Sequence, residues 1–516
     1  MERHAQIVDG VATAVRGFFK RGESYRIFHG STNSTRPRPG PNQNIVDISS
    51  LSNVVSVDTN ARTALVEPNV PMDRLVEATL PHGLVPPVVM EFPGITAGGG
   101  FSGTSGESSS FRHGFFNDTI NYVEMILGNG DVVKASRSER PDLFHGAAGA
   151  VGTLGTTTLM ELRLVEAQKW VKTTYYRTNT ISEAITRVQD ETKDPKNDYV
   201  DGILFSNNHG VIVTGQLTNE KPEDCVPRTF SKASDPWFYM YVQDKTQDLA
   251  SSSFVTDYMP LGEYLFRYDR AGFWVGRQGY TYFKYIPFNN FFRWFLDDFS
   301  HTRTLYQALH GSGISSEFVV QDLGLPYDTA ETFINFVDDE LDIWPLWLCP
   351  LKEAAMPTFH PVTSDTAETP SEKDENTSLT PSRPMLNIGV WGWGPRNNYE
   401  EFIHKNRALE DKLVELGGRK WLYAHTYYSE EEFWKIYNRP WYQALREKYS
   451  ATTLPTVYDK VKIDIEAKKQ ERKKWTSSFV SNWPVGGLYG MWLAVRSGDI
   501  GLHRNAEWKY NGDGSS

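Results

Sequence analysis

Short runs of alternating apolar and polar residues, separated by turns, fill the first third of the chain. Apolar residues at helical spacing between Pro71 and Gly83 predict a helix within this part. Before Gly22 the chain has the pattern of an amphipathic helix, and a Gly-Asn-Gly turn predicts a β-hairpin. The predicted strands cover residues 25–27, 44–49, 54–59, 63–68, 122–127 and 131–136. We therefore expect an N-terminal helix over residues 1–22 and one α+β domain over residues 23–166.

The middle of the chain alternates strand-like and helix-like patterns, which predicts a second α+β domain over residues 167–464. Ser182 reads as a helix N-cap, and Ser429 with Glu432 reads as a capping box. The predicted elements include a hairpin around 207–210, strands at 318–326, 385–394 and 420–428, and helices at 328–341 and 398–417. Residues 361–383 are polar and rich in proline, so we expect a disordered surface insertion there.

Three glycine-bearing segments interrupt the first domain. The longest, residues 91–114, combines glycines with many Ser and Thr hydroxyls, and a second one follows the first strand at residues 29–40. Backbone of this kind can approach a phosphate closely, and a purely structural loop is the alternative. No Lys-Ser/Thr pair at Walker spacing occurs, and no Gly-x-Gly-x-x-Gly opens a helix after the first strand. P-loop and Rossmann folds are therefore excluded.

Composition narrows the class of partner. The 516 residues carry a net charge of −11, which argues against nucleic-acid binding and favours a small molecule. The two cysteines, Cys225 and Cys349, are too far apart in sequence to suggest a disulfide framework or a metal site, so we expect two ordinary thiols and no bound metal. The N-terminus lacks the apolar core of a signal peptide, which predicts a cytosolic protein.

Two aromatic segments leave alternatives open. Residues 254–296 carry large rings at about one position in three, typical of a core or domain interface, or of a wall lined for a large apolar substrate. The extension over residues 465–516 is basic at first and then apolar and aromatic, interrupted by Asn482, Pro484 and Gly486. Such a pattern suits either contact with a membrane surface or docking back onto the core.

Several strings carry a resemblance. TALVEPNV, GLVPP, TAGGGFSGTSG, NYVEMILGNGDVV and DLFHGAAGAVGTLGTTT resemble the FAD-binding domain of the vanillyl-alcohol oxidase and p-cresol methylhydroxylase (PCMH) superfamily. RIFHGSTNSTRP, SGTSGESSSFRHGFF, FVVQDLGLP, WPLWLCP and YSEEEFWKIY resemble the Δ24-sterol reductases, the 24-dehydrocholesterol reductase and plant Diminuto group. The resemblance implies an α+β fold, with a two-subdomain PCMH-type FAD-binding domain followed by an α+β substrate (cap) domain.

The resemblance also assigns roles to the three loops. In relatives the first loop wraps the pyrophosphate, the second runs along the pyrophosphate and isoalloxazine, and the third closes on the adenine side. The residues implied are Gly30, Ser31, Thr32, Asn33, Ser34 and Thr35 in the first, Thr96, Gly98, Gly99, Gly103, Thr104, Gly106, Ser109 and Ser110 in the second, and Gly152, Thr153 and Gly155 in the third. Many relatives attach the flavin through a His where this protein has Asn33, so non-covalent FAD is implied.

Candidates for proton transfer are weaker. Relatives carry an acidic and thiol pair near His425 and Thr426 of this protein, and His425 beside Tyr427 can donate protons near neutral pH. A lone His in a strand is more often structural, which is the alternative. Glu317 is a weaker catalytic candidate, because it flanks a run of aromatic residues.

The resemblance implies an FAD-dependent oxidoreductase, with NADPH as electron donor, that reduces the Δ24 carbon–carbon double bond in the aliphatic tail of a sterol or related terpenoid. One alternative is an FAD-linked oxidase or dehydrogenase of a secondary metabolite using O2, and another is a flavoprotein that has lost turnover and serves as a binding partner. The expected location is the cytoplasm, with or without peripheral contact to the endoplasmic reticulum membrane through the C-terminal extension.

Overall fold

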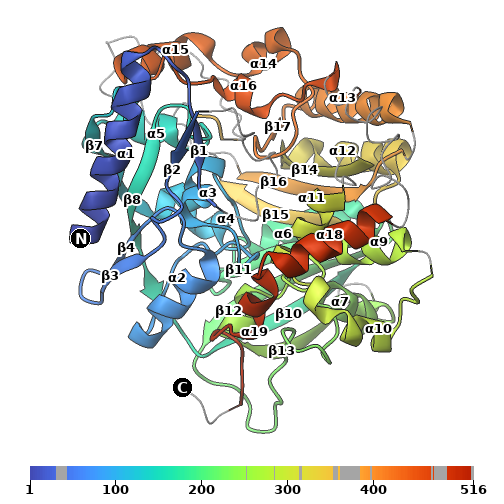
Figure 1. The fold of residues 1–516 in the computed structure, drawn as a ribbon. Coiled ribbons are helices and arrows are strands. Elements are labelled where there is room, and N and C mark those ends of the chain that lie inside the picture. The colour runs from blue at the N-terminus through green and yellow to red at the C-terminus, as the bar shows by residue number, and fades with distance from the viewer. Residues whose placement is uncertain are drawn as a thin grey trace, which may run out of the picture.

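The computed structural model describes residues 1–30, 44–250, 253–283, 285–312, 317–352, 358–360, 384–395, 398–466, 469 and 485–512. Its first part, in blue and cyan in Figure 1, holds α1, a five-stranded sheet and two strand pairs, and it lies beside a larger sheet built from the middle of the chain. The C-terminal helices lie across the front of that larger part.

The first part contains a parallel pair, β1–β2, a five-stranded sheet in the order β3-β4-β8-β6-β7, and a short pair, β5–β9. The predicted hairpin is confirmed, because β6 and β7 pair antiparallel across the Gly-Asn-Gly turn. Its elements are α1 (Glu2–Lys20), β1 (Arg26–Phe28), β2 (Ile45–Asp47), β3 (Val54–Asp58), β4 (Thr63–Val66), α2 (Met72–Thr79), η1 (Leu80–His82), β5 (Leu84–Val85), α3 (Ala97–Gly103), α4 (Ser110–His113), η2 (Phe116–Thr119), β6 (Ile120–Ile126), β7 (Val132–Ser136), α5 (Pro141–Ala147), β8 (Thr156–Arg163) and β9 (Val165–Glu166).

The middle part is built on an eight-stranded antiparallel sheet in the order β13-β10-β12-β11-β15-β16-β14-β17. Its elements are β10 (Trp170–Thr178), α6 (Ile181–Glu191), β11 (Tyr199–Ser206), β12 (His209–Thr218), α7 (Phe238–Thr246), β13 (Phe254–Pro260), α8 (Leu261–Leu265), α9 (Val275–Tyr282), α10 (Asn290–Phe295), η3 (Asp297–Phe299), α11 (Thr302–Ser312), β14 (Phe318–Pro326), α12 (Tyr327–Leu341), β15 (Leu346–Lys352), β16 (Pro384–Trp393), α13 (Tyr399–Glu415), β17 (Arg419–Lys420), α14 (Glu430–Ile436), α15 (Arg439–Lys448) and α16 (Val457–Val461). The expected α+β fold, with a PCMH-type FAD-binding domain followed by an α+β domain, is confirmed.

The two faces of this sheet bury different layers. On β14, Val319, Leu323 and Leu325 pack with α6, α12 and α13 in one apolar cluster. Phe318 and Val320 alternate with them and belong to the second cluster, which continues into the first part of the chain. Because side chains alternate along a strand, Asp322 also lies on the face turned toward the first part.

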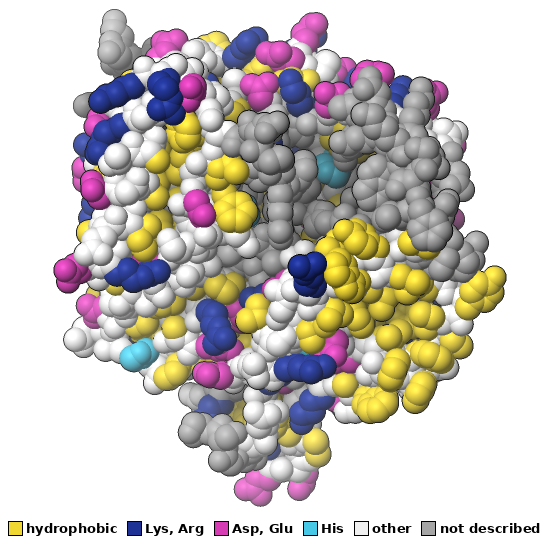
Figure 2. Space-filling model, viewed as in Figure 1, with side chains coloured by type: hydrophobic (Ala, Val, Ile, Leu, Met, Phe, Trp, Pro, Cys, Tyr) yellow, Lys and Arg dark blue, Asp and Glu magenta, His cyan; other side chains and the backbone are white. Residues whose placement is uncertain are grey.

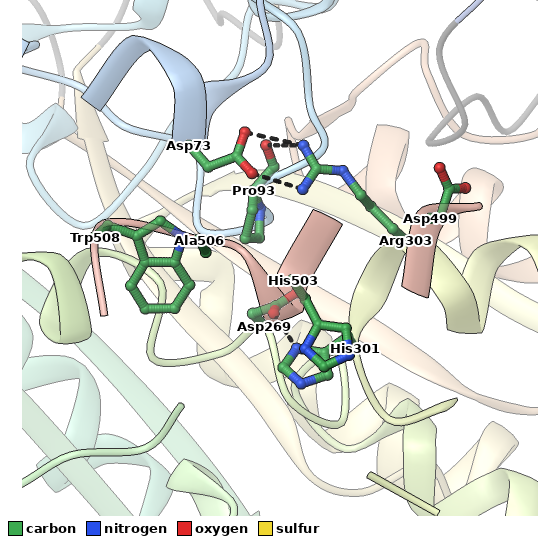
Figure 3. A pocket seen from close by; sticks show the side chains of 9 residues that line it. All are labelled: Asp73, Pro93, Asp269, His301, Arg303, Asp499, His503, Ala506 and Trp508. Carbon is green, nitrogen blue, oxygen red and sulfur yellow. Dashed lines mark hydrogen bonds and ion pairs between the residues drawn. The ribbon is translucent and has the colours of Figure 1, made fainter. Parts of the chain in front are cut away.

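The C-terminal extension forms α18 (Val485–Arg496) and α19 (Asp499–Arg504) and docks onto the core. Trp508 packs on Phe266, and the N–H of Tyr510 donates to Glu263. Figure 3 shows one joint, where His503 stacks on His301 with ring centroids 3.7 Å apart. Docking onto the core, one of the two alternatives, is therefore confirmed for this part of the extension.

Three local predictions are wrong. Residues 97–103 form a helix rather than a loop, because the Thr96 side chain caps its N-terminus by accepting from the N–H of Gly99. The helix after β10 is capped by Thr180, not Ser182. The strand predicted over residues 420–428 is much shorter in the structure, where β17 comprises only Arg419 and Lys420 and pairs with β14. The chain turns after β17, and Thr426 then forms an isolated bridge with Lys462. The insertion predicted at 361–383 lies outside the described residues.

Candidate functional site

The second and third glycine segments meet in space although they are far apart in sequence. The N–H groups of Gly149 and Val151 in the third loop donate to the carbonyls of Phe101 and Ser102 in α3. A Cβ at Gly152 would lie 3.1 Å from the Cδ1 of Ile27, on the strand that leads into the first loop. The second and third segments therefore lie against each other, beside the strand that leads into the first segment.

The glycines of α3 divide into two groups. A Cβ at Gly98 would lie 2.8 Å from the Pro68 side chain, and one at Gly100 would lie 2.8 Å from Phe116, so close packing inside the first part requires glycine at both positions. Gly99 is exposed, and a Cβ at Gly103 would meet nothing within 4 Å. The bare backbone of Gly99 and Gly103 is thus free to lie against a ligand, as FAD binding requires.

The second loop is held between the first part and the large sheet. The indole Nε1 of Trp421 donates to the Thr104 carbonyl at 2.9 Å, and the N–H of Val200 on β11 donates to the Ser108 carbonyl. A Cβ at Gly106 would lie 2.7 Å from Leu351 on β15. A ligand lying along this loop would therefore touch both parts of the chain.

Other predicted cofactor residues are engaged within the protein. The hydroxyl of Ser109 donates to the Pro87 carbonyl, and the Ser110 hydroxyl accepts from the N–H of Glu107. The Thr153 hydroxyl donates to the Ala150 carbonyl and accepts from Tyr442 at 2.7 Å. Their side chains thus shape the loops rather than point at a ligand.

The rest of the predicted set is placed by backbone conformation. Gly30, with φ of 73°, and Gly155, with φ of 151°, take conformations that glycine favours. Ser31, Thr32, Asn33, Ser34 and Thr35 lie outside the described residues.

An acid–phenol pair lies on the face of the sheet turned toward these loops. Tyr423 donates its hydroxyl hydrogen to Asp322, and the Asn387 amide donates to the same carboxylate at 2.9 Å. Burial raises the pKa of Asp322 to about 6, against the lowering effect of these hydrogen bonds. The pKa of Tyr423 is raised well above its usual value, first by burial and then by the Asp322 charge, so Tyr423 keeps its proton.

Two aromatic residues connect this pair to the second loop. Tyr306 on α11 is partly buried, and the loss of solvent around its hydroxyl, with the nearby Asp322 charge, raises its pKa to about 12. Its ring lies 6.1 Å, centroid to centroid, from that of Phe92 at the start of the second loop. Tyr306 therefore lies between the Asp322 pair and Phe92 of the second loop.

A group of buried charged residues links the start of the second loop to β11. Arg267 pairs with Glu91 at 3.1 Å and with Asp201 on β11 at 3.0 Å. Burial raises the pKa of both Glu91 and Glu107, and the two carboxyl groups share a hydrogen bond. At least one of them therefore stays protonated at neutral pH, which limits the net charge beneath the loop.

Of the three predicted catalytic residues, the structure places Tyr427 on the other face of the sheet from this pair. Tyr427 belongs to the apolar cluster beneath α13, and its N–H donates to Glu410 of that helix, so it lies on the other face of the sheet. The His425 carbonyl accepts from Gln321, which also faces α13. Glu317 precedes β14 and lies five residues before Asp322, about 16 Å along an extended strand. Tyr427 is therefore separated from the Asp322 carboxylate by the sheet, and the catalytic roles of His425 and Glu317 stay predictions.

The matching family model is an FAD binding domain, and it covers residues 5–136, which include most of α1 and the whole second loop. The protein is 28% identical over 422 residues to the Delta(24)-sterol reductase of Homo sapiens, covering 80% of this sequence and 76% of that protein. It is 27% identical over 450 residues to the Delta(24)-sterol reductase of Arabidopsis thaliana, covering 83% and 78%. The protein is thus similar to Δ24-sterol reductases of an animal and a plant over about four-fifths of its length. The resemblance inferred from sequence strings is thereby confirmed.

A further relative shares only part of the sequence. Cytokinin dehydrogenase 4 of Oryza sativa subsp. japonica is 30% identical over 155 residues, which is 30% of this sequence and 29% of that protein. The expected FAD cofactor is confirmed by the matching domain, and the open backbone at Gly99 and Gly103 fits it. When bound, FAD would supply the hydride chemistry, with the three glycine segments holding it.

Sequence reasoning missed Asp322 and Tyr423. Asp322 stands inside the string FVVQDLGLP, which carries part of the resemblance, and strand alternation there separates Asp322 from its apolar neighbours. The face of the sheet that is turned toward the loops is decided by the packing of α12 and α13 on the other face. The sequence of β14 alone does not predict that packing. Among the described residues, no group of three or more His, Cys, Asp or Glu is arranged to hold a metal ion.

Figure 3 shows a pocket at the start of the second loop, where Pro93 is one of the lining residues. Arg303 on α11 makes two hydrogen bonds to Asp73 of α2, at 2.6 and 2.9 Å, and a third to the Pro93 carbonyl. Asp269 accepts from His301 and from Thr302 at the same place. Arg303 and Asp269 are thus hydrogen-bonded within the protein, and the pocket lies where α2, α11 and the C-terminal extension meet.

Proposed function

We propose that this protein is an FAD-dependent oxidoreductase that reduces a carbon–carbon double bond in the aliphatic tail of a sterol or related terpenoid, with NADPH as electron donor. The observation that carries the proposal is the Asp322–Tyr423 pair, which lies on the sheet face that is turned toward the FAD-binding domain. The similarity to Δ24-sterol reductases over four-fifths of the sequence supports the reaction and the substrate class.

Saturating an isolated alkene requires one hydride and one proton, delivered to adjacent carbons. We infer that Asp322 holds the proton, because burial places its pKa at about 6, and that Tyr423 and Asn387 orient its carboxyl group. Tyr306 and Phe92 exclude water and offer an apolar surface to the substrate. The proton donor is therefore assigned to Asp322 in place of His425, Tyr427 and Glu317.

The reaction can be tested on the purified protein. It should be yellow, and anaerobic NADPH should bleach the flavin absorbance near 450 nm. Acid precipitation should release the flavin into the supernatant, because Asn33 stands where relatives carry the attaching His. Flavin remaining in the pellet would contradict non-covalent binding, and an unbleached spectrum would contradict NADPH as donor.

The alternative is an FAD-linked oxidase or dehydrogenase of a secondary metabolite. The partial similarity to a cytokinin dehydrogenase is the observation that favours it, and that similarity covers less than a third of the sequence. Rapid anaerobic bleaching by an alcohol or terpenoid donor, with none by NADPH, would select this alternative.

We also infer that the protein works in the cytoplasm, at the surface of the endoplasmic reticulum membrane, through its C-terminal extension. Support comes from the apolar class of substrate and from α18, where Leu488, Tyr489, Trp492 and Val495 are exposed. A fluorescent fusion of the full-length protein should overlap an endoplasmic reticulum marker, and a uniform cytoplasmic signal would contradict this location.

A further inference from the structure

Helix α18 turns its large side chains outward. The residues that it buries are small, namely Gly486, Gly487, Gly490 and Ala494. A Cβ at Gly487 would lie 2.5 Å from Tyr282 and Phe283 at the end of α9, so only glycine allows this close approach. The opposite face presents Tyr489, Trp492 and Val495, which are 41%, 49% and 53% exposed. A surface helix of a water-soluble protein normally shows the reverse arrangement.

Helix α10 continues the same surface. None of its residues is buried, and Phe291, Trp294 and Phe295 are 60%, 55% and 65% exposed. The hydroxyl of Tyr280 on α9 donates to the Phe292 carbonyl, so α9 lies between α10 and α18 and joins them. Figure 2 shows the hydrophobic side chains gathered in one area over α9, α10 and α18, which we call the aromatic surface.

The charges on these three helices have one sign. Arg277 on α9, Arg293 on α10 and Arg496 on α18 are their charged residues, and none of the helices carries Asp or Glu. Arg277 and Arg496 are exposed. The protein as a whole has a net charge of −11, so this concentration of arginine differs from the rest of the molecule.

Trp, Tyr and Phe combined with Arg are typical of surfaces that lie in the headgroup region of a bilayer. The arginines complement anionic lipid headgroups, whereas a second copy of this protein would bring the same arginines opposite each other. No helix among the described residues is long and apolar enough to cross a bilayer. At 12 residues, α18 would reach about 18 Å, short of the roughly 30 Å apolar core of a membrane.

We propose that the aromatic surface binds the headgroup layer of an anionic lipid bilayer and places the substrate site beside that layer. Helix α11 connects the two, because it packs against α18 and also carries Tyr306, whose ring borders the Asp322 pair. This inference rests on the proposed function in one respect, that the substrate resides in lipid. It adds α9 and α10 to the C-terminal extension as lipid-binding elements.

The test is sedimentation of the full-length holoprotein with vesicles of phosphatidylcholine and phosphatidylserine. We expect wild type to pellet with the vesicles, and Trp294→Glu/Trp492→Glu to lose the bound fraction by about 10-fold or more. The matched control is Val132→Glu/Val226→Glu, which adds the same charge at exposed valines, 42% and 84% exposed, elsewhere on the molecule, and it should pellet like wild type. Replacing phosphatidylserine by phosphatidylcholine should weaken binding of wild type.

Three outcomes would overturn the proposal: wild type that stays in the supernatant, a tryptophan variant that pellets like wild type, or light scattering that shows a wild-type dimer dissociated by the tryptophan substitutions. Flavin absorbance and NADPH bleaching of each variant are measured without lipid. Vesicle binding by a protein that NADPH fails to bleach would support the lipid-binding surface and overturn the proposed reaction, so the two failures are distinguishable.

Discussion

Tyr423 donates its hydroxyl hydrogen to the Asp322 carboxylate, joining the segment after β17 to the middle of β14, 101 residues earlier. Burial keeps the tyrosine protonated and raises the pKa of the acid to about 6. The pair therefore holds a proton on the side of the sheet that faces the FAD-binding domain. Its position is the basis of the first prediction.

Asp322→Asn should lower kcat by about 100-fold or more, because it removes the proposed proton donor while keeping the shape of the side chain. In wild type, kcat should rise as pH falls through about 6, since the carboxyl group is active when protonated. Stopped-flow flavin reoxidation by substrate measures this step. The control is Tyr427→Phe, on the opposite face of the sheet. Lost activity in Tyr427→Phe, with Asp322→Asn unaffected, would return the role to the residue expected from sequence.

Gly99→Val should give a folded protein without flavin. Its Cβ would lie 3.2 Å from the Thr96 hydroxyl and would project from the exposed side of α3, where we place the cofactor. Gly98→Val should instead destabilise the fold, since its Cβ would lie 2.9 Å from the Pro68 carbonyl. The ratio of absorbance at 450 and 280 nm and the melting temperature separate the two effects. A fully yellow Gly99→Val protein would show that the cofactor lies elsewhere.

Trp421→Phe should reduce the free energy of unfolding by about 1–3 kcal/mol, because the buried Thr104 carbonyl loses its hydrogen-bond donor. Urea unfolding measures this change. Trp492→Phe is the matched control, since the Trp492 side chain is 49% exposed, and its effect should stay within about 0.5 kcal/mol. Equal stability of Trp421→Phe and wild type would mean that this bond does not hold the second loop to the sheet.

The protein should lose stability in acid partly through His360. The His360 ring is buried against Phe115, and its Nε2 is hydrogen-bonded to the Asn117 side-chain oxygen at 2.8 Å. Burial lowers the pKa of His360 to about 3. The unfolded protein takes up a proton near pH 6.5, so the stability contributed by the neutral ring is present above that pH and is lost as pH falls toward 3. The melting temperature of His360→Gln should therefore fall less steeply between pH 7 and 4 than that of wild type. A parallel fall in both proteins would contradict this assignment.

The sequence predicted most elements of the fold and the general nature of the site. Alternating patterns and turns predicted the β6–β7 hairpin, and the capping box at Ser429 and Glu432 is present. These features depend on neighbouring residues, so they can be read locally. The glycine segments likewise predicted a cofactor site, because their composition reports how closely a ligand can approach the backbone.

Other features were decided by contacts between distant parts of the molecule. Residues 97–103 form a helix because Gly98 and Gly100 pack against Pro68 and Phe116, which offsets the low helical preference of glycine. The separation of Tyr427 from Asp322 follows from which face of the sheet α13 covers. The aromatic surface likewise depends on α9 bringing together α10 and α18, nearly 200 residues apart in sequence.

The sequence by itself determined which residues can form strands, caps and a close approach to FAD, because those properties belong to short segments. Only the tertiary structure decided which acid faces the cofactor loops and which aromatic side chains stay exposed to solvent. The physical reason is that burial, which raises the pKa of Asp322, and exposure, which leaves Trp294 and Trp492 in water, are set by the packing of whole layers.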